Sequence, residues 1–399
     1  MRESDKIFFG DRVLWVLLGL IALFSFLPIY SSSSNLVHVI GNGTSSGYLL
    51  KHLFIIGIGF VLMFFTHKIP YKYFKGISIL LIPLSIILLI YTATQGNIID
   101  GSNANRWLRI PIIGVSFQTS TFSSLVLMVY VANYLSKNKN HKLFFDIIPF
   151  WLPVYIIVML ILPSNFSSAF LLFFMVLTSC FISGYKLKNL LIIILFSFLS
   201  FTIFIGVIKI YPDIMPNRID TWQSRIESFI NKNEKKQESY QIERSKIAIA
   251  SGEFLGLGAG KSVMKNFLPQ SSSDFIYAII IEEYGSMGGI ILIILYLLIL
   301  FRILVISHRA QSLFGKLLTI CVGLPIIFQS FLNIGVALQV FPITGQTLPM
   351  ISSGGTSAWM TCLSFGIILS VSSYYTNLIS ENELEGNNDN PLKILSETV

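Results

Sequence analysis

The chain has 399 residues, of which 53% are hydrophobic and only 12% are charged. Soluble globular domains carry about 25% charged residues, so this composition excludes a soluble protein and predicts one that crosses a membrane about ten times. The net charge of +8 indicates basic cytoplasmic loops beside anionic lipid, and no nucleic-acid partner is expected.

Apolar runs in the first half of the chain predict seven membrane-spanning helices. They lie at about residues 13–30, 49–66, 77–94, 118–135, 147–162, 165–184 and 190–210. The polar segment 31–48 is predicted to be the loop between the first two helices. A second loop, 96–117, contains the sequence GSNANRWLRIPIIG.

The second half adds a long polar region, residues 211–273, and three further spans. These spans begin near Asp274, Leu317 and Thr356. The run from Asp274 to Arg302 is too long for one hydrocarbon span, so the sequence predicts a kink, at Gly288-Gly289.

Together these elements predict an all-α polytopic membrane protein with about ten transmembrane helices. One membrane domain covers residues 1–379 and has a large extracytoplasmic loop, about 211–273, between the seventh and eighth helices. The acidic, Asn-rich segment 380–399 is predicted to be a short, disordered cytoplasmic tail.

Lysine and arginine in the short polar segments predict the orientation of the chain in the membrane. The basic segments are the N-terminus, 67–76, 136–142, 185–189 and 306–316, and they alternate to one side. The positive-inside rule assigns that side, with both termini, to the cytoplasm. The other loops, at 31–48, 96–117, 211–273 and 341–355, then share the external face, which predicts a common site there.

Asp274 stands where a polar, glycine-rich loop becomes an apolar helix, in the stretch Gly252–Gly285. Two roles fit this position: a general base, or a helix N-cap, although Ser271–Ser273 could supply the cap instead. Glu282 and Glu283 follow roughly 12 Å further along the helix. Acids within a membrane are costly, so we expect them to face a cavity, an ion pair or a neighbouring loop.

Two other loops carry residues suited to a site. Arg106 and Trp107, in the loop before the fourth span, predict either a phosphate contact or an anchor to lipid headgroups. Residues 333–357 read NIGVALQVFPITGQTLPMISSGGTS. Their prolines and glycines predict a re-entrant segment that lines a site, or else an ordinary loop.

No cofactor motif is evident. The glycines of GLGAGK (Gly256, Gly258 and Gly260) lack the GxxxxGK[ST] spacing, so they predict close backbone approach and no nucleotide site. The three cysteines lie in apolar runs without CxxC spacing and the five histidines are scattered, so no disulfide, zinc cluster or haem is expected.

Four segments resemble the signature blocks of the FtsW/RodA/SpoVE (SEDS) family. They read NANRWL, SYQIERSKIAIASGEFLGLGAGKS, LPQSSSDFIYAIIIEEYG and NIGVALQVFPITGQTLPMISSGGTS. The resemblance implies a SEDS, GT-C-like fold in the bacterial cytoplasmic membrane and a peptidoglycan glycosyltransferase that polymerises lipid II on the outer face. It also implies a class B penicillin-binding protein as partner, with other membrane proteins of the divisome or elongasome.

The family's catalytic aspartate falls on Asp274. The residues expected to contact substrate are Arg106, Trp107, Lys261, Glu282, Glu283, Pro349, Ser352, Gly354 and Gly355. A divalent cation, Mg²⁺ or Mn²⁺, is the candidate cofactor. Thr121 and Ser124 stand where the family has an acid and a lysine, so any role of that pair is in doubt here.

Two other functions remain compatible with the sequence: a lipid II flippase and a non-catalytic division scaffold. The short tail and compact loops favour a division role, like that of FtsW, over an elongation role, like that of RodA.

Overall fold

The computed structural model describes residues 10–40, 44–94, 98–99, 102–103, 107–109, 116–137, 143–210, 237–268 and 271–388. Its helices are α1 (Arg12–Ile40), α2 (Ser45–Lys68), α3 (Phe74–Thr94), α4 (Thr119–Lys137), α5 (Leu143–Asp146), α6 (Leu152–Ile161), α7 (Phe166–Ile182), α8 (Leu187–Ile210), α10 (Gln237–Gly252), α11 (Ile276–Arg309), α12 (Leu313–Ala337) and α13 (Thr356–Asn388). A π-helical turn, Ile147–Trp151, joins α5 to α6. Two short hairpins pair β1 (Ile98–Ile99) with β2 (Ser102–Asn103) and β3 (Trp107–Arg109) with β4 (Ser116–Gln118).

A helix stands at each of the ten predicted span positions. Among the described residues, eight helical segments are long and apolar enough to cross a membrane. The other two positions hold α7, which has 17 residues, and α4, whose first turns are rich in serine and threonine. The polytopic all-α fold predicted from the sequence is therefore confirmed.

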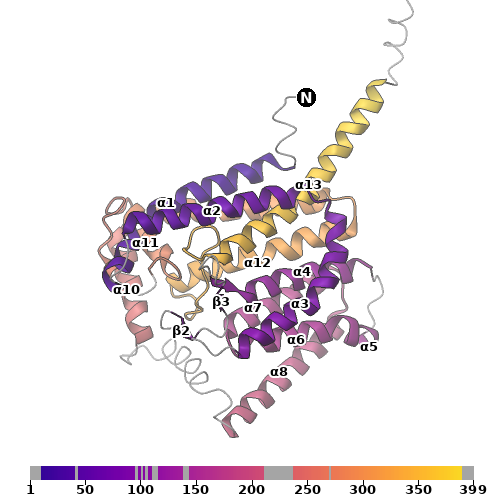
Figure 1. Ribbon diagram of the computed structural model, residues 1–399, viewed down its shortest axis with the longest axis horizontal. Helices are drawn as coiled ribbons and strands as arrows, with labels where there is room; N and C mark the ends of the chain where they lie inside the picture. The colour runs from indigo at the N-terminus through magenta and orange to yellow at the C-terminus, as the bar shows by residue number, and fades with distance from the viewer. Residues whose placement is uncertain are drawn as a thin grey trace, which may run out of the picture.

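The helix α12 lies at the centre of the bundle. It packs against α11, α4, α13 and α7, and α2 packs along α13. Figure 1 shows α1, α2 and α13 on one side of α12, and α3, α4, α6 and α7 on the other. The helix α8 lies at the edge of the bundle, and most of its apolar side chains are exposed, as expected where lipid is the solvent.

Small residues allow α2 and α13 to approach closely. A methyl group on Gly59 would lie 2.7 Å from Cys362 Sγ, and one on Gly366 would lie 2.7 Å from Thr66 Cβ. Such contacts replace the hydrophobic effect, which provides little attraction between helices in lipid. All three cysteines are buried and free, so the prediction of apolar packing residues is confirmed.

The first helix is longer than predicted. The segment 31–40, expected in a loop, continues α1. Ser32 Oγ donates to Ile29 O at 3.3 Å and Ser33 Oγ to Tyr30 O at 2.8 Å. Because these hydroxyls bond to carbonyls of their own helix, the serine run can stay helical and buried.

The predicted loop and tail also contain helix. The segment 237–252 of the expected external loop forms α10, which packs against α11. At the C-terminus, α13 runs past Ser380, the predicted start of the tail, as far as Asn388.

The kink in α11 occurs at Gly285, not at Gly288-Gly289 as predicted. Gly285 has φ +69 and ψ −179, which breaks the helical backbone there. The glycine-rich loop docks on this break: Gly258 N donates to Glu283 O at 3.0 Å, and Ser286 N donates to Glu253 O at 2.9 Å. The loop thus binds backbone groups that the kink removes from the helix.

Glycine is required on both sides of this contact. A methyl group on Gly256 would overlap Glu283 O, and one on Gly285 would overlap Phe254 O. Gly256 also has φ +81, which side chains disfavour. The close backbone approach predicted for the loop glycines is confirmed for Gly256 and Gly258, whereas a methyl group on Gly260 would meet no atom within 4 Å.

Candidate functional site

Asp274 lies in a turn, residues 271–275, immediately before α11. The N-cap of α11 is Phe275, and no side chain makes a capping hydrogen bond there. The alternative in which Asp274 is the N-cap is therefore wrong. The residue is partly exposed.

The segment 338–355, which connects α12 to α13, holds this turn in place. Asn333, near the end of α12, donates from Nδ2 to Asp274 O at 2.9 Å and to Gln346 O at 2.7 Å. Ser352 Oγ donates to Ser273 O at 2.6 Å. These bonds fix the turn through its backbone carbonyls.

Glycine lies beside the carboxylate on the side of this segment. Gly345 has φ +66, and a methyl group on it would lie 3.5 Å from Asp274 Oδ2. Any larger side chain would crowd the carboxylate at this point. The glycine therefore keeps one approach to Asp274 open.

The four predicted residues of the α12–α13 connection lie in this segment. Ser352 bonds to the Asp274 turn, and Pro349 O accepts a bond from Tyr296 OH at 2.6 Å within the core. Gly354 and Gly355 lead into α13, with Gly355 at φ +46. The segment is irregular backbone packed within protein, as a re-entrant connection requires.

Glu282 is fully buried and binds the loop that precedes the turn. It accepts hydrogen bonds from Val263 N at 2.9 Å, from Met264 N at 3.1 Å and from Ser262 Oγ. These donors lead into the short 3-10 helix Met264–Asn266. The carboxylate thus satisfies the free amides at the start of that helix.

Glu283, only 1% exposed, joins the same loop to α1. It accepts from Ser262 N at 3.3 Å and from Ser31 Oγ. Lys265 Nζ lies 3.2 Å from Ser31 Oγ and donates to Gly260 O at 2.8 Å. Of the roles expected for the two glutamates, the bond to a neighbouring loop is the one the structure contains.

Sequence reasoning missed Ser31, Ser262 and Lys265. Two buried acids within a membrane require several hydrogen-bond donors. The sequence therefore indicated that donors must lie near Glu282 and Glu283. The donors themselves could not be identified, because Ser31 is more than 200 residues away in the chain. Its assignment to a loop concealed it further.

The remaining predicted residues are less completely described. Lys261 is exposed, in a turn closed by its N–H bond to Gly258 O at 3.1 Å. Arg106 lies outside the described residues, and Trp107 is described only as backbone in β3. The next strand, β4, ends at Gln118, whose N–H donates to Thr356 Oγ1 at 3.1 Å. The hairpin therefore reaches the start of α13.

Four separate parts of the chain thus meet at one end of the bundle, which we call the site end. They are the β3–β4 hairpin, the loop 253–275, the connection 338–355 and the C-terminal part of α1. The prediction that these loops share one end is confirmed for the described residues. The side of the membrane they face stays a prediction.

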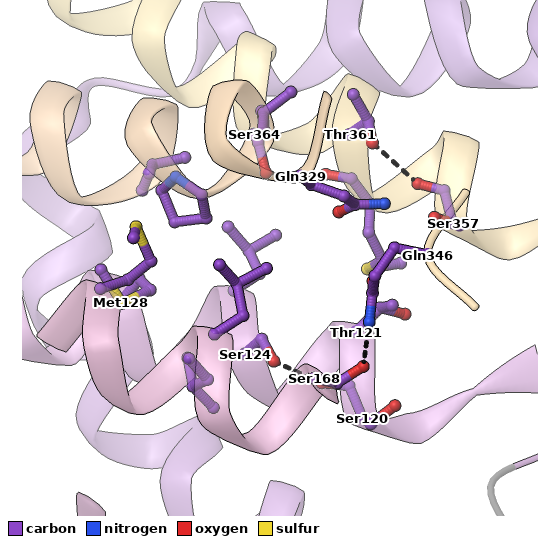
Figure 2. A pocket seen from close by; sticks show the side chains of 18 of the residues that line it. Ser120, Thr121, Ser124, Met128, Ser168, Gln329, Gln346, Ser357, Thr361 and Ser364 are labelled. Atoms are coloured by element: carbon purple, nitrogen blue, oxygen red, sulfur yellow. Dashed lines mark hydrogen bonds between the residues drawn. The ribbon is translucent and has the colours of Figure 1, made fainter. Parts of the chain in front are cut away.

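A cavity of about 100 Å³ lies beside this end, between α4, α7, α12 and α13 (Figure 2). Its polar wall consists of Ser120, Thr121, Ser124, Ser168, Gln329, Gln346, Ser357, Thr361 and Ser364. The remaining wall is apolar, with Met128, Met175 and Cys321 among its residues. None of the lining residues is charged.

The hydroxyl groups of this wall mostly donate to their own helices. Thr121 Oγ1 donates to Gln118 O at 2.9 Å, and Ser124 Oγ donates to Ser120 O at 2.7 Å. Their remaining lone pairs can accept bonds in the cavity. Thr121 and Ser124 therefore form a neutral, acceptor-rich surface where the family resemblance implies an acid and a lysine.

Gln346 connects the cavity to the turn of Asp274. Its Nε2 donates to Ser168 Oγ at 2.8 Å in the cavity wall. Its backbone carbonyl shares the Asn333 amide with Asp274 O. Three hydrogen bonds thus connect Ser168 in the cavity wall to the turn.

A resident metal ion does not fit the described part of the site. No group of three His, Cys, Asp or Glu side chains there could hold one. Of the groups bonded to the Asp274 turn, the Asn333 amide nitrogen is not a cation ligand, and the Ser352 hydroxyl donates to Ser273 O. No chemical step is therefore assigned to Mg²⁺ or Mn²⁺.

A comparison with protein-family models decides the family. The model described as "Cell cycle protein", that of FtsW/RodA/SpoVE, matches residues 11–377. The chain belongs to this family. With its membrane-crossing helices, it is a multi-pass protein of the bacterial inner membrane.

Relatives of known name support this family over most of the chain. The "Probable peptidoglycan glycosyltransferase FtsW" of Hydrogenovibrio crunogenus is 30% identical over 355 residues, which cover 86% of this chain and 87% of the relative. The protein of the same name in Wigglesworthia glossinidia brevipalpis is 31% identical over 364 residues, with 89% and 91% covered. The protein of the same name in Bacillus subtilis is 29% identical over 364 residues, which cover 88% of this chain and 87% of the relative.

Solved structures share the fold. One from a study titled "Structural coordination of polymerization and crosslinking by a peptidoglycan synthase complex" matches with a TM-score of 0.71 and 22% identity, covering 92% of this chain and 98% of its own. The rod shape determining protein RodA of Thermus thermophilus matches with a TM-score of 0.64 and 22% identity, covering 91% and 96%.

Proposed function

We propose that this chain polymerises lipid II into glycan strands during cell division, with Asp274 as the general base. That the chain is a peptidoglycan glycosyltransferase follows from its family and from the names of its relatives. The substrate, the base and the division role are the proposal. The observation that carries it is the Asp274 turn, which is fixed through its backbone carbonyls at the site end and whose aspartate is partly exposed.

In the proposed reaction, Asp274 accepts the proton of the acceptor sugar hydroxyl. The hydroxyl oxygen forms a bond to the anomeric carbon of the lipid-linked donor, and the bond from that carbon to the diphosphate oxygen breaks. Undecaprenyl diphosphate leaves with the bonding electrons, so negative charge grows on phosphate oxygens. A positioned base of this kind contributes roughly 10²–10⁴-fold to a rate.

Positive side chains at the site end would stabilise the leaving group. Lys261 is exposed there, on the loop that Glu282 and Glu283 fasten to α11 and α1. Arg106 lies outside the described residues, and in the sequence it directly precedes β3, whose partner strand β4 reaches the start of α13. We assign both residues to phosphate contact, Arg106 because its planar fork suits two phosphate oxygens.

We also propose a class B penicillin-binding protein as the partner that crosslinks the new strands. The related structure whose title names polymerisation and crosslinking in one complex supports this pairing. The proposed orientation has the site end outside the cell and both termini in the cytoplasm, as the basic loops predict.

The proposed function is tested with the purified chain and its partner in proteoliposomes that contain lipid II. Asp274→Asn keeps the volume of the side chain but cannot accept a proton, so polymerisation should fall at least about a hundredfold. Glu243→Gln, at an exposed acid of α10, is the matched control and should polymerise normally. Normal glycan synthesis by a folded Asp274→Asn protein would refute the assignment.

The same preparation tests the two alternatives. Movement of labelled lipid II across the vesicle membrane without glycan synthesis would indicate a flippase. Normal cell division with the Asp274→Asn protein as the only copy would indicate a scaffold.

A further inference from the structure

The helix α10 is fixed beside the Asp274 turn. Ser245 Oγ donates to Ala337 O, at the end of α12, at 3.1 Å. On the neighbouring turn, Ile242 packs against a small apolar cluster formed by Leu268, Phe275, Ile279, Val336 and Ile343. Phe275 directly follows Asp274, so α10 and the proposed base are attached to the same cluster.

Arg244 extends from this helix and lies over two aromatic rings. Its guanidinium carbon is 4.7 Å from the centroid of the Tyr240 ring, one helical turn earlier, and 5.8 Å from that of Phe267. Phe267 precedes Leu268 of the apolar cluster. The rings attract the cation and restrict its side chain, so the guanidinium group is held in one place before any ligand arrives.

The guanidinium group has an unmet need for acceptors. Arg244 Nε is buried and has no hydrogen-bond partner among the described residues. Within the described residues no carboxylate forms an ion pair with Arg244; the ion pair found there joins Arg302 to Asp11. An arginine side chain stays charged at every physiological pH, and a buried donor of a charged group is costly without an acceptor.

These three observations indicate that the missing acceptor is supplied by a bound molecule. A guanidinium group presents parallel N–H donors that match two oxygens of one phosphate. From this geometry we propose that Arg244 binds a phosphate group at the site end. The ligand is the diphosphate of the lipid-linked donor, or else the phosphodiester of an anionic membrane lipid.

The first source is favoured by position, since Arg244 and Asp274 flank the same apolar cluster. This identification of the ligand rests on the proposed function. If it is correct, Arg244 positions the leaving group while Asp274 acts on the acceptor. If Arg244 only attached α10 to Phe267, replacing it would not change the affinity for phosphate.

The test measures binding without turnover. Native mass spectrometry of the full chain counts bound undecaprenyl diphosphate and, in a second arm, bound phosphatidylglycerol. All proteins carry Asp274→Asn, so the result does not depend on whether Asp274 is the base. Arg244→Gln should weaken undecaprenyl diphosphate binding about tenfold or more, because two charge-assisted bonds are lost.

The matched control is Lys246→Gln, at an exposed cation of the same helix, and its affinity should stay within about twofold of the parent. Loss confined to phosphatidylglycerol would keep the phosphate site and assign it to membrane lipid. Unchanged affinity in both arms would overturn the proposal.

A second variant distinguishes a loss of phosphate binding from misfolding. Arg244→Lys keeps the charge and the aromatic contacts but lacks the fork, so it should bind undecaprenyl diphosphate several-fold more weakly than the parent. Thermal unfolding of each variant identifies any protein in which α10 no longer packs against the rest of the chain. A folded Arg244→Lys protein with the affinity of the parent would also overturn the proposal.

Discussion

Replacing Glu282 by alanine should release the loop that leads to the Asp274 turn. The carboxylate accepts bonds from Val263 N, Met264 N and Ser262 Oγ, and it is fully buried. Removal leaves three donors without acceptors, the buried hydroxyl of Ser262 and two partly buried backbone amides. Each costs about 1–3 kcal/mol, and because such costs are not additive and water can enter, we expect about 3–5 kcal/mol in total.

Glutamine at this position should behave differently. Its Oε1 can still accept from Val263 N and Met264 N, and its amide can donate to Ser262 Oγ once that hydroxyl rotates. Only the contribution of the charge is lost, about 1 kcal/mol. Glu282→Gln should therefore retain most of the stability and polymerisation that Glu282→Ala loses.

The assay is thermal unfolding in detergent, followed by limited proteolysis of the loop and glycan synthesis from lipid II. We expect Glu282→Ala to lower Tm by roughly 5 °C and to expose the loop to protease. The control is Glu243→Ala, an exposed acid of α10, which should change neither. A Glu282→Ala protein with unchanged Tm and protection, but without activity, would refute the structural role and indicate direct contact with substrate.

Three further predictions concern the kink, the turn and the cavity. Gly285→Ala should abolish stable folding, because its methyl group would overlap Phe254 O at positive φ, whereas Gly19→Ala meets no atom within 4 Å and should express normally; size-exclusion profiles compare them. Asn333→Ala removes one bond to the turn and one to the connection 338–355, and it should lower glycan synthesis severalfold at a stability cost of about 1–3 kcal/mol; unchanged turnover would contradict this. Thr121→Glu puts an unpaired charge in a neutral cavity and should lower Tm. Adding Ser124→Lys, one helical turn away, should restore part of the lost Tm. An equal loss of Tm in the double variant would show that the introduced glutamate and lysine do not pair.

Much of the architecture followed from local chemistry. Apolar runs of membrane-spanning length can satisfy their backbone only as helices, so a helix at each of the ten positions could be predicted from composition and length. The glycines of the loop 252–260 predicted close backbone approach, because a residue without a Cβ lets another backbone come near. The signature blocks gave the family before any packing was considered.

Boundaries and partners were decided by contacts distant in sequence. The serine run after α1 reads as loop by itself, and it is helical because its hydroxyls bond within the helix and Ser31 bonds to Glu283. The kink lies at Gly285 because the loop supplies backbone partners to the residues on both sides of it. Among the described residues, the loop supplies none to Gly288 or Gly289.

The sequence alone determined a multi-pass helical protein of this family with an acidic residue, Asp274, at the start of a helix. Only the tertiary structure decided what surrounds that residue. Asn333 and Ser352 hold its turn from another part of the chain, while Glu282 and Glu283 bind a loop. The reason is that a polar group in a membrane protein must find its partner wherever the fold offers one, and sequence distance does not reveal that place.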